Sequence, residues 1–249
     1  MRIINPFAFS SGSVNLGSRD FASASSQYFS RSSSATVETG DVDFWVSCWF
    51  KADSASANMT MIGKWAGTPG REYLLRWNIA FTGFVDWFVR NAGDTANFNV
   101  TAGSSLSTGT WYHTFAYHDA SANQIGVALD GGSFSTTSLS GGVNVAGEDF
   151  QVGAADSSGF FDGKLLNVAF GKPPSTPTWA DLRDALYNSG NALYWEDISG
   201  ANRTAWGLTS GNGVWYPLNE TSAGDDAIDN VAGLTLTDVN TVGVSADVP

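Results

Sequence analysis

The carboxylates of this chain are too scattered to form a catalytic pair. Hydrolysis of a glycosidic bond needs two carboxyl groups that face each other across the bond, which a strand supplies when acidic residues alternate on one face. The glutamates are isolated, at Glu38, Glu72, Glu148, Glu196 and Glu220. Asp41 and Asp43 would share a face, but they precede a predicted strand and lack a third partner. Turn capping explains them better, and we predict that the protein is not an enzyme.

The two histidines and the single cysteine do not indicate a metal or nucleophile site. His113 and His118 lie five residues apart on one predicted strand, which puts them on opposite faces and roughly 16 Å apart. Cys48 lies within an apolar strand pattern, where a buried and inert thiol is expected. No serine nucleophile elbow, phosphate-binding loop or zinc-protease motif occurs. We expect packed histidines and no cysteine chemistry.

The ten tryptophans are the residues best suited to ligand binding, because an indole ring can stack on a sugar. Most should fill the core, and we assign Trp45, Trp49 and Trp111 to it. Three others lie near predicted turns or on strands with mixed faces, and they are the candidate glycan-binding residues: Trp65, Trp77 and Trp87.

Composition indicates one large β domain that binds neither nucleic acid nor membranes. Of the 249 residues 43% are hydrophobic and only 14% are charged, while Gly, Ser, Thr, Ala and Asn fill the segments between apolar runs. The formal net charge is -12, so a basic footprint for nucleic acid or an anionic membrane is missing. No apolar run reaches transmembrane length, and the first residues lack the apolar core of a signal peptide. We therefore expect synthesis and folding in a cytosol.

Alternating apolar residues predict a series of short strands. In the segment 41–51 the side chains of Phe44, Val46, Cys48 and Phe50 fall on one face, with Trp45 on the other. A hairpin is predicted from 111–118 to 124–130, joined by the polar loop 119–123. The other predicted strands are 21–30, 59–65, 73–79, 83–90, 134–139, 149–153, 160–170, 214–220 and 234–242.

Helix signals occur only late in the chain. Thr178 can cap a helix, with Asp181 completing a capping box, and Gly190 can end it. A second, weaker helix is predicted to start at Asp197 or Ser199.

The strands resemble, in the same order, those of the concanavalin A-like lectin/glucanase superfamily in its laminin-G-like branch. The segments that carry the resemblance are DFWVSCWFKAD, MIGKW, LSTGTWYHTFAYHD, QIGVALDGG and FFDGKLLNVAF, followed by WADLRDALYNSG. The resemblance covers about residues 21–190 and implies an all-β jelly-roll sandwich with one or two short helices near the C-terminus.

The two ends of the chain depart from the family pattern. The family's opening strand pair is absent before Phe21, and a similar segment stands at 215–243 instead. We therefore divide the chain into an N-terminal arm (1–20), the sandwich (21–190) and a C-terminal extension (191–249). The extension completes either its own sandwich, as in a circular permutation, or that of a neighbouring subunit. The sequence does not choose between them.

The resemblance also implies a calcium site in a rim loop. Calcium takes hard oxygen ligands, and the candidates are Asp119 and Asn123 in the hairpin loop, together with Asp156 and Asp162 before the last core strand. The alternative is that these side chains cap turns. We predict no other cofactor.

Two classes of function fit these features. The first is a non-enzymatic structural or adhesive protein of a virus particle, such as a bacteriophage capsid decoration or tail component. It would contact other virion proteins or further copies of itself through the arms, and we leave open whether it binds surface glycans. A lectin-like domain without a secretion signal favours this class. The alternative is an extracellular carbohydrate-binding module of a polysaccharide-degrading system.

Overall fold

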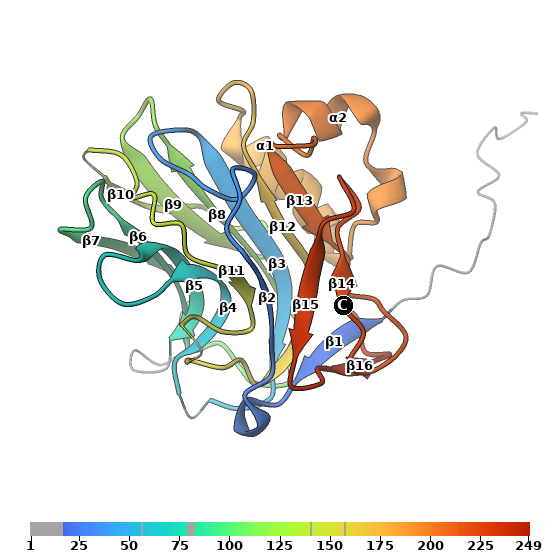
Figure 1. The fold of residues 1–249 in the computed structure, drawn as a ribbon. Helices are drawn as coiled ribbons and strands as arrows, with labels where there is room; N and C mark the ends of the chain where they lie inside the picture. Colours follow the sequence, from blue (N-terminus) through green and yellow to red (C-terminus); the bar gives the residue numbers. More distant parts are fainter. Residues whose placement is uncertain (1–16, 56, 79–82, 140, 157) are drawn as a thin grey trace, which may run out of the picture.

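The alternation of apolar and polar side chains folds the chain into two sheets that pack face to face (Figure 1). The structure is a computed structural model and describes residues 17–55, 57–78, 83–139, 141–156 and 158–249. Every pairing between named strands in these residues is antiparallel. The predicted all-β jelly-roll sandwich is therefore confirmed.

The first sheet contains the predicted hairpin and the strand pair that flanks it. Its spatial order is β10 (Ser135–Ser138), β9 (Gln124–Leu129), β8 (Tyr112–Asp119), β3 (Phe44–Ala52), β12 (Gly163–Gly171), β1 (Ser18–Phe21) and β16 (Gly243–Ser245). A further strand, β13 (Gly213–Tyr216), also pairs with β12.

The second sheet contains the central meander of the chain. Its spatial order is β14 (Ala227–Ile228), β15 (Thr235–Val239), β2 (Tyr28–Arg31), β11 (Phe150–Val152), β4 (Met59–Trp65), β5 (Arg71–Asn78), β6 (Phe84–Arg90) and β7 (Asn97–Ala102). The segment predicted as one strand at 21–30 is thus two strands in different sheets, separated by a 3-10 turn at Ser23–Ser25.

The main core lies between the sheets, and the faces of β3 are as predicted. Phe44, Val46 and Phe50 point into this core, where Phe44 packs on Trp87 with ring centroids 6.0 Å apart. Trp45 points to the opposite side, into a second apolar cluster. Both faces of β3 are covered, because each apolar face must be buried against another layer.

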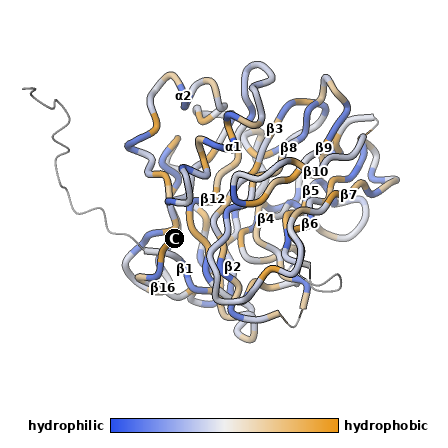
Figure 2. Tube along the Cα trace, turned by 180° about the vertical axis from the view of Figure 1, so that it is seen from behind, coloured by the Kyte–Doolittle hydropathy of each residue, from blue (hydrophilic) through white to orange (hydrophobic). Residues whose placement is uncertain are grey.

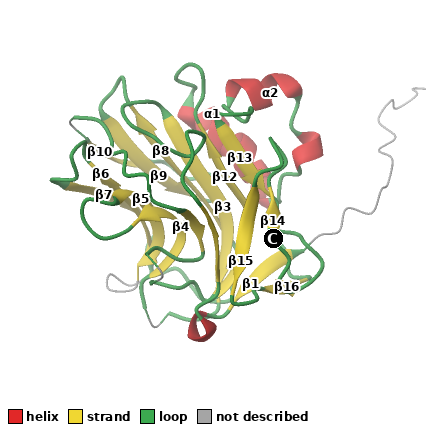
Figure 3. Ribbon diagram, in the orientation of Figure 1, coloured by secondary structure: helices red, strands yellow, loops and turns green. Residues whose placement is uncertain are grey.

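The two helices lie at one end of the sandwich (Figure 3). Helix α1 (Trp179–Tyr187) covers the outer face of the first sheet, as the view from behind shows (Figure 2), and Trp179 stacks on Tyr117 at 4.7 Å. Thr178 is its N-cap, but it makes no side-chain capping bond, so the predicted capping box does not form. The helix ends at Tyr187, with Asn188 as its C-cap in the left-handed region, and a 3-10 turn at Asn188–Gly190 follows, so Gly190 ends that turn and not the helix.

The second predicted helix is also present. Helix α2 spans Gly200–Ala205, and the hydroxyl of its N-cap, Ser199, accepts a hydrogen bond from the backbone N–H of Asn202. No helix in the described part of the chain is long and apolar enough to cross a membrane.

The C-terminal segment folds into the sandwich of its own chain. Strand β13 pairs with β12, β15 with β2, and β16 with β1. In this structure, which contains one chain, the tail packs in cis.

The predicted N-terminal arm is wrong for residues 18–20. They belong to β1, which lies between β12 and β16, and the side chain of Arg19 is completely buried. The segment looks polar in the sequence, but the charge of Arg19 is paired inside the protein. Its partners are Asp238 and nearby backbone carbonyls. Residues 1–16 of the predicted arm lie outside the described residues.

Candidate functional site

One edge of β12 pairs with two different strands, one on each side of a bulge. Residues 163–165 of β12 pair with β1, whereas residues 168–171 pair with β13 on the same edge. Between them Asn167 has a positive φ of 49°, and the register with β3 shifts between Leu166 and Ala169. The backbone N–H of Asn167 donates to the carbonyl of Pro217 at 3.1 Å. The bulge thus opens a fork in the first sheet, and bulges of this kind often re-aim side chains at functional sites.

The segment between the two helices crosses over this fork. The side-chain amide of Asn167 donates to the carbonyl of Leu193 at 2.7 Å, which fixes the segment above the bulge. Trp195 then lies 6.3 Å from Trp215 between ring centroids, with the planes tilted by 46°. The guanidinium of Arg203 lies 3.9 Å from the ring centroid of Trp195 and donates to the carbonyl of the same residue. Trp195 is therefore held from two sides.

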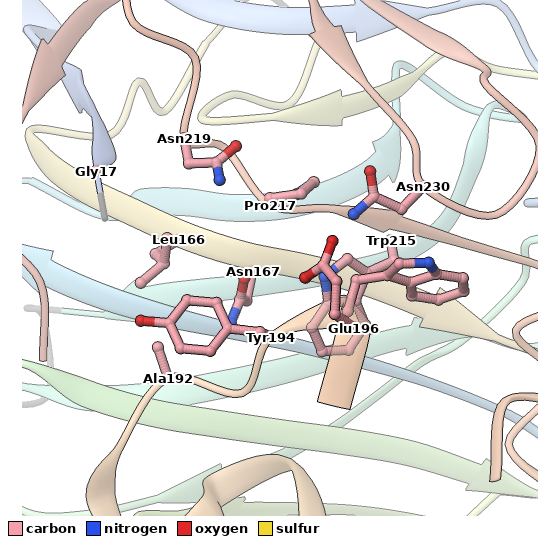
Figure 4. Close-up of a pocket in the computed structure, with 11 residues that line it drawn as sticks. Gly17, Leu166, Asn167, Ala192, Tyr194, Glu196, Trp215, Pro217, Asn219 and Asn230 are labelled. Carbon is pink, nitrogen blue, oxygen red and sulfur yellow. The ribbon is translucent and has the colours of Figure 1, made fainter. Parts of the chain in front are cut away.

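A pocket lies at the fork and is partly open to solvent; its empty space is about 440 Å³ when the open solvent at its mouth is included. We call it the fork pocket, and its lining combines aromatic rings, amides and one carboxylate: Gly17, Leu166, Asn167, Ala192, Tyr194, Trp195, Glu196, Trp215, Pro217, Asn219 and Asn230. Figure 4 shows Asn219, Pro217 and Asn230 along one side and Tyr194 with Ala192 along the other.

A buried aspartate orders the backbone beside two lining residues of the fork pocket, Trp215 and Asn230. Asp229 is 2% exposed, and its carboxylate accepts hydrogen bonds from the backbone N–H groups of Trp215, Val231 and Ala232. The backbone N–H of Asn230 in turn donates to the carbonyl of Trp215. Asp229 therefore positions both an indole and an amide of the pocket without lining it.

The lining offers hydrogen-bond donors and acceptors next to flat apolar surfaces. Burial, together with the negative charge of Asp197, raises the pKa of Tyr194, so its hydroxyl stays protonated at neutral pH and can donate. The Nε1 of Trp215 is buried and has no hydrogen-bond partner in the described part of the chain. Amides, a hydroxyl and indole rings in one pocket suit a neutral, hydroxyl-rich ligand with an apolar face.

The family follows from a match over residues 23–172, more than half of the chain, to the model of the concanavalin A-like lectin/glucanases superfamily. The chain belongs to this superfamily. The match ends before the segment 191–198 and the tail, so the family model covers Asn167 but not the aromatic residues of the fork pocket. No curated protein matches the chain.

Two of the solved structures that are similar to this lectin-like chain show the extent of the likeness. One is a candidate carbohydrate-binding protein from Bacteroides ovatus, with 18% sequence identity, a TM-score of 0.61 and coverage of 92% of this chain and 59% of the other. The other is a heptameric SAP-like pentraxin from Limulus polyphemus, with 11% identity, a TM-score of 0.51 and coverage of 69% and 82%. The chain spans about three-fifths of the length of the Bacteroides protein. At these identities the likeness establishes the fold alone.

None of the three predicted glycan-binding tryptophans lines the fork pocket of this lectin-like chain. Trp77 and Trp87 are completely buried between the sheets, so the prediction that they stack on a sugar is wrong for this structure. Their strands are apolar enough on both faces that alternation could not show which face is inner. Trp65 is half-buried at the end of β4, on the outer face of the second sheet.

Of the three tryptophans assigned to the core, two lie there. Trp45 and Trp49 are buried, whereas Trp111 is half-exposed just before β8, and its indole donates to Asp247 at 3.0 Å. The C-terminal segment provides this partner, which the sequence could not indicate.

The candidate calcium ligands form two groups at opposite ends of the first sheet. Asp119 and Asn123 flank the loop from β8 to β9, while Asp162 precedes β12 and Asp156 is exposed further upstream. Asp119 accepts hydrogen bonds from the backbone of Ala122 and from the side chains of Ser121 and Trp179. These bonds outweigh burial, which by itself would raise the pKa of Asp119, and the net shift is downward.

The other three candidates have different surroundings. Asn123 has a positive φ of 49°, Asp156 one of 50°, and Asp162 accepts a bond from the backbone N–H of Ser23. Within the described ranges no three His, Cys, Asp or Glu side chains gather where a metal ion could be held. Calcium binding at these residues stays a prediction.

The histidines and the cysteine are packed, as expected. His113 packs on Trp49 on the outer side of the first sheet, and His118 packs on Phe44 in the main core. Burial lowers the pKa of both histidines, for His113 to about 3. Burial raises the pKa of the Cys48 thiol. None of these groups reaches the fork pocket.

Sequence reasoning missed the residues that form the fork pocket. Tyr194 and Trp195 form an aromatic pair directly before two acidic residues, in a stretch without helix or strand periodicity. An aromatic pair in a loop is a signal for binding and could have been noticed. The position of Asn167 could not, because its left-handed backbone and the fork depend on pairing between distant strands.

Proposed function

We propose that this chain is a non-catalytic carbohydrate-binding domain and that the fork pocket is its sugar site. The observation that supports this most is the convergence of Trp195, Trp215 and Tyr194 with the amides of Asn167 and Asn219 on one pocket. A sugar ring presents an apolar face of C–H groups and an edge of hydroxyls. The rings of Trp195 and Tyr194 would contact the apolar face, whereas Trp215 is only 2% exposed and packs in the second apolar cluster. The amides would bind the edge of hydroxyls.

The absence of a second carboxylate supports a binding role. Glu196 is the one carboxylate among the described residues that line the pocket. In most families of glycoside hydrolases, both retaining and inverting hydrolysis use two carboxyl groups, at separations from about 5 to about 9.5 Å. A single exposed carboxylate can accept hydrogen bonds from sugar hydroxyls, but it cannot protonate the leaving group and at the same time act as nucleophile or base on the other side of the bond. The fork pocket therefore suits recognition of a sugar without cleavage of it.

The fixed arrangement of the lining also supports binding. Asn167 is locked by its bond to Leu193, Trp215 by Asp229, and Trp195 by Arg203. Groups that are already ordered lose little conformational entropy when a ligand binds.

A glycan array followed by calorimetry tests the proposal. The expected result is binding of at least one neutral oligosaccharide, which Trp195→Ala weakens by at least about tenfold, a loss of about 1.4 kcal/mol. Trp111→Phe is the control, since Trp111 is half-exposed but does not line the pocket. Equal loss in both variants, or full binding by Trp195→Ala, would contradict the proposal.

The biological setting is a separate hypothesis. The sequence favours a component of a virus particle, with an extracellular module as the alternative, and a glycan-binding domain is compatible with both. Mass spectrometry of purified virus particles tests the first. Detection of the protein there, in a fixed ratio to a capsid or tail protein, would support it.

A further inference from the structure

A second group of binding-type side chains lies on the outer face of the second sheet. Strand pairing places Trp65 opposite Arg71, Leu74 opposite Phe88, and Arg76 opposite Asp86. Neither α1 nor α2 covers this face, since both helices lie on the side of the first sheet (Figures 1 and 3). We call the group formed by Trp65, Arg71, Arg76, Phe88 and Arg90 the arginine face.

The aromatic rings of this face are in contact with its arginines. Trp65 and Phe88 meet edge to face, with ring centroids 6.3 Å apart and an angle of 77°. The guanidinium of Arg76 lies 4.3 Å from the ring centroid of Phe88, and that of Arg71 lies 5.9 Å from the Trp65 ring. Arginine and aromatic rings thus form one continuous surface, held by cation–π contacts.

Buried carboxylates hold the arginines from beneath. Asp94, with 1% of its side chain exposed, binds the Nε atoms of both Arg71 and Arg90. Asp86, with 2% exposed, binds Nε and Nη2 of Arg76. The carboxylates are inaccessible, whereas the side chains of Arg71 and Arg76 are each 22% exposed. The charge offered to solvent is therefore positive.

Several donors of the arginine face are still available. The two Nη atoms of Arg71 and the Nη1 of Arg76 have no hydrogen-bond partner among the residues that the structure describes. Each guanidinium is oriented by an aspartate on one edge and offers its other edge. This arrangement suits a ligand oxyanion, because guanidinium groups bind planar carboxylates through paired hydrogen bonds.

The three arginines of this face contrast with the acidic charge of the whole chain. The net charge is -12, and the sequence has only 12 Lys and Arg residues. Three of them meet on this face against two aspartates, which leaves an excess of one positive charge. An anionic ligand would be repelled by most of the protein and attracted here.

We propose that the arginine face is a second binding site, distinct from the fork pocket, for a saccharide that carries a carboxylate. The guanidinium edges of Arg71 and Arg76 bind the acid group, and the half-exposed ring of Trp65 packs on the apolar face of the sugar ring. Leu74 lies opposite Phe88 on the same face and is 5% exposed.

The test compares one saccharide with and without its charge, on the full chain. Oligogalacturonate and its methyl ester have the same rings, and they differ only in the acid group. Calorimetry at low ionic strength should give binding of the acid and, for the ester, an affinity at least roughly tenfold lower. Equal affinities would overturn the proposal, as would binding of a sulfated dextran oligosaccharide without binding of oligogalacturonate.

Variants locate the site. Arg71→Gln should weaken oligogalacturonate binding by roughly tenfold or more, and Asp94 keeps Arg90 as a partner, so the fold should tolerate the change. Arg71→Lys retains the charge but lacks the forked donors of a guanidinium. Its affinity for oligogalacturonate should lie between those of the unchanged protein and of Arg71→Gln. Trp195→Ala, in the fork pocket, should bind oligogalacturonate normally. Loss of binding in Trp195→Ala, with full binding in Arg71→Gln, would place the acid in the fork pocket and refute a second site.

Discussion

Replacing Arg19 should remove a large part of the stability of the fold, because this side chain joins the first described strand to the C-terminal segment. It is completely buried and makes hydrogen bonds with four oxygens of that segment. These are the carbonyls of Ser222 at 3.0 Å, Asp225 at 2.9 Å and Val242 at 3.1 Å, and a carboxylate oxygen of Asp238 at 3.1 Å.

The size of the effect follows from the groups left behind. Arg19→Met retains the length of the side chain but removes a donor from a carboxylate and three carbonyls, of which those of Ser222 and Val242 keep a backbone N–H donor. Removing one partner of a buried ion pair typically costs about 3–5 kcal/mol. Asp238 retains the hydrogen bonds from the backbone of Thr241 and Val242, which places the expected loss near the lower end. A loss of about 3 kcal/mol is a large fraction of the 5–15 kcal/mol that is typical of whole domains.

Urea denaturation followed by tryptophan fluorescence measures this loss. Lys51→Met is the matched control, since the Lys51–Asp247 pair also ties the body of the sandwich to the C-terminal segment, but its side chains are 20% and 36% exposed. Such exposed pairs contribute at most about 1 kcal/mol. If Arg19→Met lost no more than Lys51→Met, the buried network would not be what holds the two segments together.

Three further predictions concern the fold. A chain that ends at Gly190 should aggregate or unfold, because it lacks β13, β15 and β16. Adding a peptide of residues 211–249 should rescue it. A truncated protein that light scattering shows to be soluble, and that is equally stable, would contradict this prediction. Phe44→Ala should cost about 3–5 kcal/mol in denaturant melts, and Trp111→Ala clearly less because Trp111 is half-exposed; the reverse order would show that the assignment of faces is wrong. Because burial lowers the pKa of His113 to about 3, against 6.5 when unfolded, the unfolded state binds the extra proton, and stability should fall as the pH falls from about 6.5 towards 3, by up to about 1.4 kcal/mol per pH unit. His113→Gln should flatten that slope, and an unchanged slope would assign it to other groups.

Local patterns were sufficient to predict most of the sandwich. Strand β4 has the bounds that alternation predicted, and the faces of β3 are correct, because each depends only on neighbouring residues. Strand β7 alternates as Asn-Phe-Asn-Val-Thr-Ala, but it was not predicted. Strand β1 gave no local signal, since Ser18, Arg19 and Asp20 look like a polar loop until their distant partners are present.

The candidate site was less accessible to sequence reasoning. Trp77 and Trp87 could not be told from exposed rings, because burial depends on which sheet face is inner. Trp195 and Trp215 are 20 positions apart in the sequence, and they meet only because β13 pairs with β12 beyond the bulge at Asn167. The fork pocket depends on how distant strands pair, so the pattern of any single segment could not predict it.

The most direct test of the sugar site is an NMR titration that follows the indole N–H signals of the ¹⁵N-labelled full chain. An oligosaccharide that binds should shift the signals of Trp195 and Trp215, which line the fork pocket, while the signal of Trp111 stays in place. Loss of the Trp195 signal in Trp195→Phe assigns the resonance. Shifts confined to other tryptophans, with those of Trp195 and Trp215 unchanged at saturation, would contradict the proposal that the fork pocket binds the sugar.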